Sequence, residues 1–383
     1  MSNSEVLIVA GEASADHHAA KVVRALAQNG IHSYGMGGDR MIAAGFESVA
    51  HAHEISVMGL VEVLRHLPRI LGVMSRMKQV VRERKPKVAL LLDLPDFNLR
   101  FARFLRSQGV YVIYYISPQV WAWRQRRVKE IRKVVGEMLC VLPFEQPFYA
   151  EHHVNARFIG HPLTEDLREP LAAEALRRAL PAGPTVALLP GSRRQESHRL
   201  LPAMLAAAEQ VRMAHPEASF VMPLAGTTVE REVEEALVAH PELRARLHLV
   251  HGQAQEVLSV AQVAVVASGT ASLEAALIGV PFIVVYRMSP VTYWLARRII
   301  KGATLLAVSS IVLANLILGE KRIKELLQGE ASADNIARFL LRGLEEPALA
   351  AAAHDTREAL LKTLGAQSAT AGVVAAIEQA LRS

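Results

Sequence analysis

Two short segments decide the fold of this chain: LLPGSR at residues 188–193 and ASGTASLE at residues 267–274. Each follows an apolar run typical of a buried strand, and each leads into a helix-like pattern. A glycine-containing turn at that place lets backbone N–H groups and the positive end of a helix face an anion. Two such turns in the second half of the chain predict a site for a nucleotide diphosphate.

Polar side chains in these two segments suit a nucleotide. Arg193 can offer a planar guanidinium fork to a diphosphate, and Glu274, one helical turn beyond Thr270, can hold ribose hydroxyls. Either turn alone is equally explained as the capped start of a helix, but the pair favours the diphosphate. The candidate nucleotide-binding residues are Gly191, Ser192, Arg193, Ser268, Gly269, Thr270, Ala271 and Glu274.

Apolar strands alternate with helical stretches along the chain, which indicates parallel α/β layers. With 383 residues the chain is too long for one ordinary core, and prolines and glycines between 160 and 184 mark a boundary. We therefore expect an α/β fold with two Rossmann-like, doubly wound domains, 1–165 and 166–345, facing a cleft. The expected strands are 6–10, 32–35, 88–92, 110–116, 138–142, 157–159, 185–189, 220–224, 247–250, 263–267 and 282–286.

Composition restricts the partners and the compartment. A net charge of +6 and a pI near 9.5 favour anionic partners, and nucleic acid ranks last because no long basic run with interleaved aromatics occurs. The single cysteine, Cys140, excludes an internal disulfide and fits a reducing compartment. No secretory signal is visible. The uncharged stretch 302–319 is as long as the shortest membrane spans, but its polar residues favour a buried or interfacial segment.

A carboxylate follows the buried strand 88–92. Asp93 ends that strand, and Asp96 follows Pro95, which fixes a turn. Aspartate is common in turns for structural reasons as well. A general base needs a carboxylate that is fixed and partly desolvated so that its pKa rises, and Asp93 fits this better than Asp96. Asn98 is placed to cap the next helix.

Three other segments keep more than one interpretation. The loop after the first strand holds Glu12, Ser14 and Asp16, which either cap a helix or line the cleft. The aromatic and basic cluster at 117–127 suits a nucleic-acid loop, a membrane anchor or a wall for a sugar or phosphate. The basic amphipathic stretch 56–84 is either a core-facing helix with a solvated basic side or a surface that docks on an anionic bilayer.

Eight motifs occur in unbroken order from the first strand to about residue 328. They are GExSxD (11–16), SVMGxVEV (56–63), DxPDFN (93–98), SPxVWAWR (117–124), LPFE (142–145), FIGHP (158–162), LPGSR (189–193) and SGTA (268–271). Jointly they are highly specific, and with them the chain resembles the lipid-A-disaccharide synthase family. Two positions depart from the family's usual pattern: Ala15 stands in place of a glycine, and Ala314 in place of a proline.

The resemblance implies an inverting GT-B glycosyltransferase of the Gram-negative cytoplasm that needs no metal and no cofactor. It implies transfer from UDP-2,3-diacylglucosamine to 2,3-diacylglucosamine 1-phosphate (lipid X), at the inner-membrane surface, with release of UDP and a β-1,6-linked disaccharide. It also implies a homodimer, with the C-terminal helices 346–383 exchanged or packed back on the first domain. Asp93 becomes the expected base, and Asn315 joins the donor site. The remaining acceptor or loop candidates are Glu12, Ser14, Asp16, Met58, Asp96, Trp123 and Arg124.

Two alternatives stay open at this point. One is another GT-B enzyme that uses UDP-N-acetylglucosamine, such as an epimerase or a transferase for a soluble sugar. The other is a non-catalytic lipid-binding homologue. The basic amphipathic stretch and the positive net charge favour a lipid acceptor over a soluble sugar.

Overall fold

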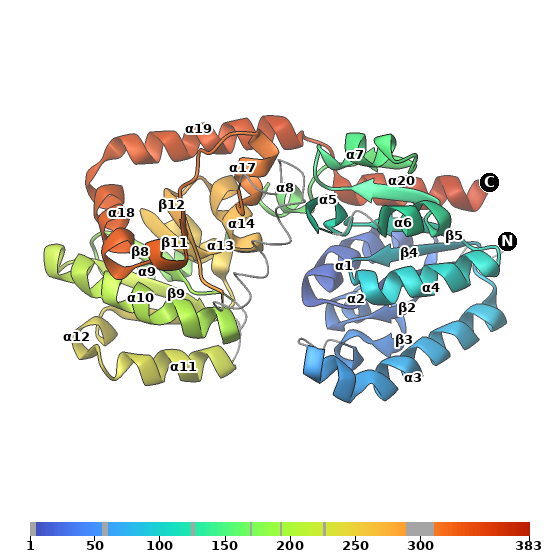
Figure 1. The fold of residues 1–383 in the computed structure, drawn as a ribbon, viewed down its shortest axis with the longest axis horizontal. Coiled ribbons are helices and arrows are strands. Elements are labelled where there is room, and N and C mark those ends of the chain that lie inside the picture. Colours follow the sequence, from blue (N-terminus) through green and yellow to red (C-terminus); the bar gives the residue numbers. More distant parts are fainter. Residues whose placement is uncertain are drawn as a thin grey trace. The chain divides into compact units, whose positions relative to one another are not determined.

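The computed structural model describes residues 5–55, 60–123, 127–168, 171–191, 194–224, 227–288 and 310–383. It divides the chain into two compact units, one made of Met1–Glu165 and Leu364–Ser383 and the other of Asp166–Thr363 (Figure 1). The last helix therefore belongs to the first unit, although the sequence grouped residues 346–383 together.

The first unit contains seven parallel strands in the order β3-β2-β1-β4-β5-β6-β7. The strands are β1 Glu5–Ala10, β2 His32–Gly37, β3 Glu47–His51, β4 Val88–Leu92, β5 Tyr111–Tyr115, β6 Glu137–Cys140 and β7 Ala156–Phe158. The helices are α1 Ala13–Gln28, α2 Asp39–Ala43, α3 Leu60–Arg84, α4 Pro95–Ser107, α5 Val120–Trp123, α6 Val128–Val134, α7 Glu145–Glu151, α8 Pro162–Asp166 and α20 Ala369–Arg382.

The second unit contains six parallel strands in the order β10-β9-β8-β11-β12-β13. The strands are β8 Thr185–Leu189, β9 Ser219–Leu224, β10 Leu247–His251, β11 Val263–Ala267, β12 Phe282–Tyr286 and β13 Glu325–Leu327. The helices are α9 Glu174–Ala179, α10 Arg194–Ala214, α11 Thr227–Leu237, α12 Pro241–Arg244, α13 Ala254–Val260, α14 Thr270–Ile278, α17 Leu313–Leu318, α18 Ala333–Glu345 and α19 Pro347–Leu364.

Both sheets follow the order of a doubly wound fold, in which the chain reverses its direction of winding at one point. That switch point lies between β1 and β4 in the first unit and between β8 and β11 in the second. Ligands of such folds bind beyond the carboxyl ends of the strands at the switch point. The predicted class, two Rossmann-like doubly wound domains, is confirmed.

Burial on both faces explains why the central strands are continuous apolar runs. In β4 every residue from Val88 to Leu92 is fully buried. Ala89 and Leu91 face the core formed with α3, α4 and α6, while α20 packs against β4 and β5 and against α1. Each buried leucine stabilises the fold by about 1.5–3 kcal/mol.

The C-terminal helices join different units. Arg357 on α19 donates from Nε to the carbonyl oxygen of Leu277 at 3.0 Å, within the second unit. At the start of α20, Ser368 Oγ donates to Glu165 at 2.6 Å. By length and composition alone, the described stretch 347–382 could cross a membrane. Core helices share this composition, and here the stretch is two helices separated at residues 365–368.

Candidate active site

Two acidic side chains lie at the switch point of the first unit. Glu12 follows β1 and Asp93 follows β4, and the two strands pair with Ala10 opposite Leu92. The side chains of Glu12 and Asp93 are hydrogen-bonded to each other, and burial raises the pKa of the Asp93 carboxyl above its usual range. A partly desolvated carboxylate binds a proton more readily than an exposed one, as a general base requires.

The turn that carries Asp93 is strained. Asp93 and Leu94 both have a φ of +48°, in the left-handed region. A non-glycine residue there costs about 1–2 kcal/mol. Gly11 makes room for the turn, because a Cβ at Gly11 would lie 2.7 Å from Cδ2 of Leu94. Strain of this kind is found where a side chain must point in one direction for function.

Asp16 has a structural task in the same unit. It is 6% exposed, and its carboxylate accepts hydrogen bonds from the backbone N–H groups of Gly38 (2.8 Å), Arg40 (3.1 Å) and Met41 (3.2 Å). It therefore caps α2 and fixes the turn at Gly38. Ala15, at a position where the family usually has glycine, is a buried residue in the first turn of α1 and does not have a positive φ.

The other acceptor candidates are placed as follows. Ser14 is exposed on α1. Asp96 has 74% of its side chain exposed and forms an ion pair with Arg127. Trp123 is the last residue of α5. Met58 and Arg124 lie outside the described residues.

A buried carboxyl at the start of α7, which sequence reasoning did not assign, contacts α5 and the loop after β6 in the first unit. Glu145 is 1% exposed, and it accepts hydrogen bonds from Trp121 Nε1 at 3.3 Å and from the backbone N–H of Leu142 at 3.2 Å. Burial raises its pKa to about 7, against the opposing effect of a hydrogen bond with Ser117. The only sequence signal was the glutamate of LPFE among apolar residues.

In the second unit, the two glycine turns lie side by side at the switch point. Strand β8 pairs with β11, with Leu189 opposite Val266. Gly191 has a φ of +99°, and a Cβ there would lie 3.3 Å from the Cβ of Ala267. Thus the structure brings the described parts of the two predicted segments together. Ser192 and Arg193 lie outside the described residues.

The second turn leads into α14. Gly269 is the N-cap of this helix, and no side chain among the described residues caps it with a hydrogen bond. The first N–H groups of a helix have no partner within the helix, and they carry a partial positive charge. Gly269 and Thr270 are exposed, Ser268 and Ala271 are half-buried, and Glu274 is half-buried one turn further along α14. This end of α14 can therefore accept an anion.

Asn315 is used within the chain. It is 2% exposed; its Nδ2 donates to the carbonyl of Ile323 (2.8 Å) and to Glu325 Oε1 (3.2 Å). Its Oδ1 accepts from the N–H groups of Arg322 (3.1 Å) and Ile323 (2.9 Å). These bonds fill the capacity of the amide, so Asn315 holds the loop between α17 and β13. Ala314 beside it is fully buried in α17.

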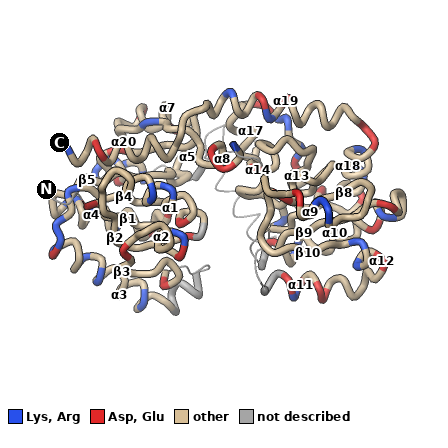
Figure 2. The backbone as a smooth tube through the Cα atoms, turned by 180° about the vertical axis from the view of Figure 1, so that it is seen from behind, with Lys and Arg blue, Asp and Glu red and all other residues tan. Residues whose placement is uncertain are grey.

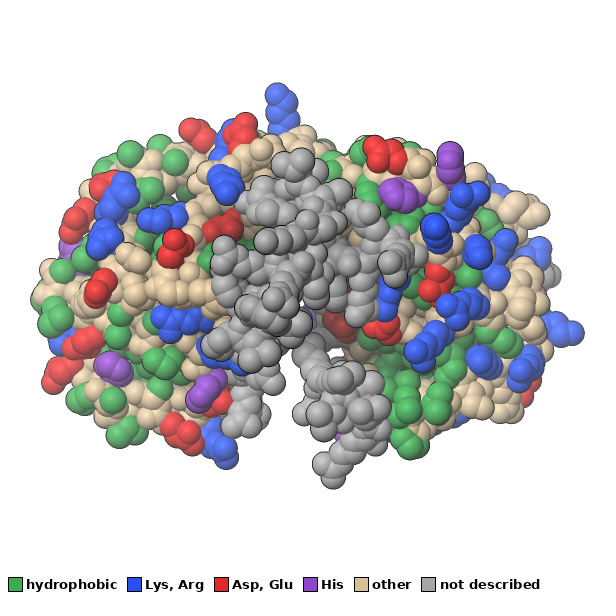
Figure 3. All heavy atoms as spheres, in the orientation of Figure 1, with side chains coloured by type: hydrophobic (Ala, Val, Ile, Leu, Met, Phe, Trp, Pro, Cys, Tyr) green, Lys and Arg blue, Asp and Glu red, His purple; other side chains and the backbone are tan. Residues whose placement is uncertain are grey.

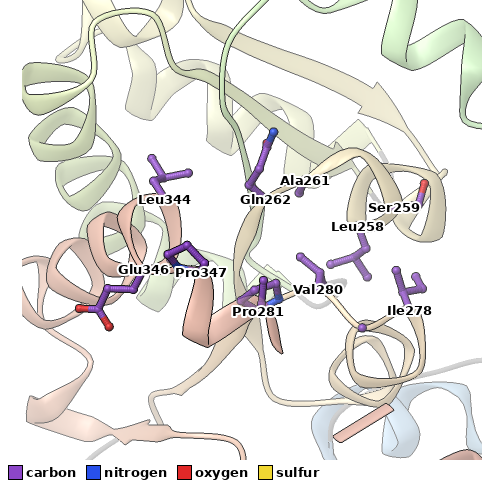
Figure 4. Close-up of a pocket in the computed structure, with 13 residues that line it drawn as sticks. Leu258, Ser259, Ala261, Gln262, Ile278, Val280, Pro281, Leu344, Glu346 and Pro347 are labelled. Carbon is purple, nitrogen blue, oxygen red and sulfur yellow. The ribbon is translucent and has the colours of Figure 1, made fainter. Parts of the chain in front are cut away.

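A pocket of about 390 Å³ lies in the second unit, lined by residues of α13, α14 and the α18–α19 junction (Figure 4). Ala261 and Gln262 immediately precede β11, and Val280 and Pro281 precede β12. The pocket is thus at the amino ends of these strands, opposite the glycine turns. Ligands of doubly wound folds bind at the carboxyl ends, so this pocket is not the nucleotide site.

Solved structures define the class of fold. The chain is similar to UDP-GlcNAc 2-epimerase from Neisseria meningitidis, with a TM-score of 0.67 and 14% identity, over 98% of this chain and 100% of that one. It is also similar to the calicheamicin glycosyltransferase, with a TM-score of 0.61 and 15% identity, over 100% of this chain and 99% of that one. The fold is GT-B, the class built from two Rossmann-like domains.

Sequence comparison defines the family. The family model described as lipid-A-disaccharide synthetase matches residues 6–377. The lipid-A-disaccharide synthase of Anaeromyxobacter dehalogenans is 48% identical over 349 residues, covering 90% of this chain and 89% of the relative. That of Geobacter sulfurreducens is 38% identical over 384 residues, covering 97% of each. The chain belongs to the lipid-A-disaccharide synthetase family.

Proposed function

We propose that this protein is the glycosyltransferase that forms the lipid A disaccharide. It transfers 2,3-diacylglucosamine from its UDP conjugate to 2,3-diacylglucosamine 1-phosphate, releasing UDP and inverting the anomeric centre. The proposal is supported by a difference in chemistry between the switch points of the two units, in a chain that belongs to this family. Half-buried acidic groups lie at one switch point, and glycine turns with a helix N-terminus lie at the other.

Asp93 is the general base of the proposed reaction. It takes the proton from the acceptor hydroxyl as the hydroxyl oxygen attacks the anomeric carbon of the donor. Burial raises the pKa of Asp93, so its carboxylate is a stronger base than that of an exposed aspartate. Glu12 is hydrogen-bonded to Asp93 and orients the carboxylate. The bond between the anomeric carbon and the diphosphate oxygen breaks in the same step, and UDP leaves with the electron pair.

The second unit holds the donor. The N-terminus of α14 and the N–H groups near Gly269 receive the diphosphate, Arg193 binds its oxygens, and Glu274 binds the ribose. These groups stabilise the charge that develops on UDP in the transition state. The proposal assigns this task to the chain and not to a metal ion.

The same unit that holds the base is proposed to dock on the inner membrane from the cytoplasmic side, because both substrates carry acyl chains. One face of α3 is buried through Val73, Met77 and Val81. Leu67 and Leu71 on α3 are 38% and 56% exposed. Figure 3 shows hydrophobic side chains gathered over this part of the first unit, and Figure 2 shows Lys and Arg along α3. Each basic residue near an anionic surface contributes about 1 kcal/mol.

Vesicle binding tests the docking surface. Leu67→Glu with Leu71→Glu should weaken binding to anionic vesicles at least about tenfold, because the variant no longer places two leucines at the headgroup boundary. Circular dichroism should show a folded protein, and UDP binding should be unchanged. The matched control is Met213→Glu with Val238→Glu on the second unit, where the side chains are 64% and 82% exposed. Equal vesicle binding by both double variants would place the docking surface elsewhere.

The proposal includes a homodimer that exchanges C-terminal segments. In one chain, α20 packs on α1 of the first unit, and Asn29 Nδ2 donates to Glu378 Oε1 at 2.6 Å. An exchanged dimer would make the same contacts with α20 of a second copy, after residues 365–368 open. Light scattering of the full chain measures the mass; a monomer at all concentrations would remove this part of the proposal.

A further inference from the structure

The strain at the candidate base continues into the next strand. Ile116, which follows β5, has a φ of +63°, an outlier for a β-branched side chain. The backbone N–H of Asp93 donates to the carbonyl oxygen of Tyr115 on β5, at 3.4 Å. Among the described residues, seven non-glycine residues have a positive φ. Three of them, Asp93, Leu94 and Ile116, directly follow β4 or β5, so the strain is concentrated where the base is.

Two buried side chains bind the backbone of this turn. Asn98 on α4 donates from Nδ2 to the carbonyl oxygens of Leu92 (2.9 Å) and Asp93 (2.8 Å). Tyr114 on β5 donates its hydroxyl hydrogen to the same carbonyl of Asp93. The side chain of Asn98 thus reaches back to the strand end, whereas the sequence suggested a cap of α4. In the part of the chain that the structure describes, no side chain caps that helix.

The environment keeps both donors in place. Asn98 and Tyr114 are 0% exposed, and burial raises the pKa of the Tyr114 hydroxyl well above its usual range, so it stays protonated and can donate. Rotating the Asp93–Leu94 peptide out of the left-handed region would turn its carbonyl away from both donors. Buried donors without an acceptor are unfavourable, and this opposes the relaxation of the turn.

The direction of the Asp93 side chain depends on this peptide. The φ of Leu94 and the ψ of Asp93 set the plane of the peptide whose carbonyl is clamped. The position of the Asp93 Cβ, and with it the hydrogen bond that the Asp93 carboxylate accepts from Glu12, follows from that plane. A catalytic group is effective only when it is held in its productive geometry.

We propose that Asn98 and Tyr114 are positioning residues: by clamping the Asp93 carbonyl they hold the strained turn and aim the base at the acceptor hydroxyl. The inference rests on the proposed function, in which Asp93 is the base. Neither side chain needs to touch a substrate. Their loss should therefore affect turnover and leave donor binding, which belongs to the second unit, as it is.

Tyr114→Phe is the sharpest test, because the ring keeps its buried volume and only the hydroxyl is lost. We expect kcat to fall about ten- to hundredfold, a part of the 10²- to 10⁴-fold effect of a general base, while KM for the donor stays unchanged. Asn98→Ser should lower kcat in the same way. The double variant should lose less than the product of the two single losses, because both residues hold one carbonyl.

The matched control is Tyr34→Phe on β2 of the same unit. Tyr34 is also 0% exposed, and its hydroxyl has no hydrogen-bond partner among the described residues. Its ring lies under the guanidinium group of Arg84, and phenylalanine keeps that ring. This variant should keep the kcat of the unchanged protein. If Tyr114→Phe also keeps it, the inference is overturned. Asp93→Asn distinguishes failure of the proposed base from failure of the positioning role. If Asp93→Asn retains full turnover, Asp93 is not the base, whatever the Tyr114 variant does.

Discussion

The switch points of the two units have the same topology and opposite chemistry. At the first, the strands are followed by Glu12 and Asp93, with a left-handed turn without glycine and a carboxyl whose pKa is raised by burial. At the second, the strands are followed by Gly191 and Gly269, and a helix begins with no side-chain cap from the described residues. In the function proposed above, the first switch point takes up a proton and the second holds an anion, so one fold supplies both halves of a group transfer.

Replacing the base should produce the largest effect. Asp93→Asn keeps the size of the side chain but removes its basicity, so kcat should fall about 10²- to 10⁴-fold. Binding of the UDP-sugar, measured by calorimetry, should stay close to that of the unchanged protein. Wild-type turnover would make Asp93 structural and turn attention to Glu12.

Removing Arg193 at the second switch point should produce an intermediate effect, on kcat/KM and on KM for the donor. Arg193→Ala should remove the charge-assisted hydrogen bond that we propose to the diphosphate, worth about 1.5–3 kcal/mol, or about ten- to 150-fold in kcat/KM. The loss should include a higher KM for the donor. Arg193→Lys should restore only part of it, because lysine lacks the planar fork. Full activity of the alanine variant would remove Arg193 from the site.

The buried carboxyl of Glu145, at the start of α7, predicts a pH effect on stability. The pKa of Glu145 is raised to about 7 in the folded protein, so the folded state keeps a proton that the unfolded state has lost. The free energy of unfolding should therefore fall as the pH rises from about 4.5, the usual value, to about 7, and this contribution should be constant above. Glu145→Gln lacks the contribution.

Urea unfolding of the two proteins between pH 5 and 8 measures this difference. The gap between the unchanged protein and Glu145→Gln should change across that range. Glu47→Gln is the control, because a hydrogen bond from Arg84 lowers the pKa of Glu47 and its titration lies below pH 5. A gap for Glu145→Gln that does not vary with pH would show that Glu145 stays ionised.

The smallest expected effect is that of a chelator. If Arg193 and the N-terminus of α14 stabilise the charge on UDP, EDTA should leave kcat unchanged. The measurement is a rate with and without EDTA, followed by addition of Mg²⁺ or Mn²⁺. Strict dependence on the added ion would mean that Arg193 and the N-terminus of α14 do not stabilise the charge on UDP without a metal.

The two switch points could be predicted from the sequence because their signals are local. The runs 88–92, 185–189, 263–267 and 282–286 coincide with β4, β8, β11 and β12, since strands buried on both faces are continuously apolar. The largely exposed β3 and the three-residue β13 lack that pattern and were missed. The polar residue or glycine that follows each central strand then marked the switch point.

Residues whose tasks depend on distant partners could not be found in this way. Tyr114 and Asn98 reach backbone carbonyls of β4 and of the turn after it, and Glu145 reaches an indole 24 residues away. Asn315 was expected in the donor site; among the described residues its amide bonds to its own loop and to Glu325, and its place in the donor site stays a prediction. None of these pairs follows a helical or strand period, so the sequence holds no pattern for them.

A single-turnover assay tests directly whether this protein makes the disaccharide with Asp93 as the base. The purified full chain is given UDP-2,3-diacylglucosamine and 2,3-diacylglucosamine 1-phosphate, and the products are followed by mass spectrometry. UDP and disaccharide 1-phosphate should appear in equal amounts, and Asp93→Asn should make them about 10²- to 10⁴-fold more slowly. UDP binding without disaccharide formation, or conversion of UDP-N-acetylglucosamine instead, would contradict the proposed function.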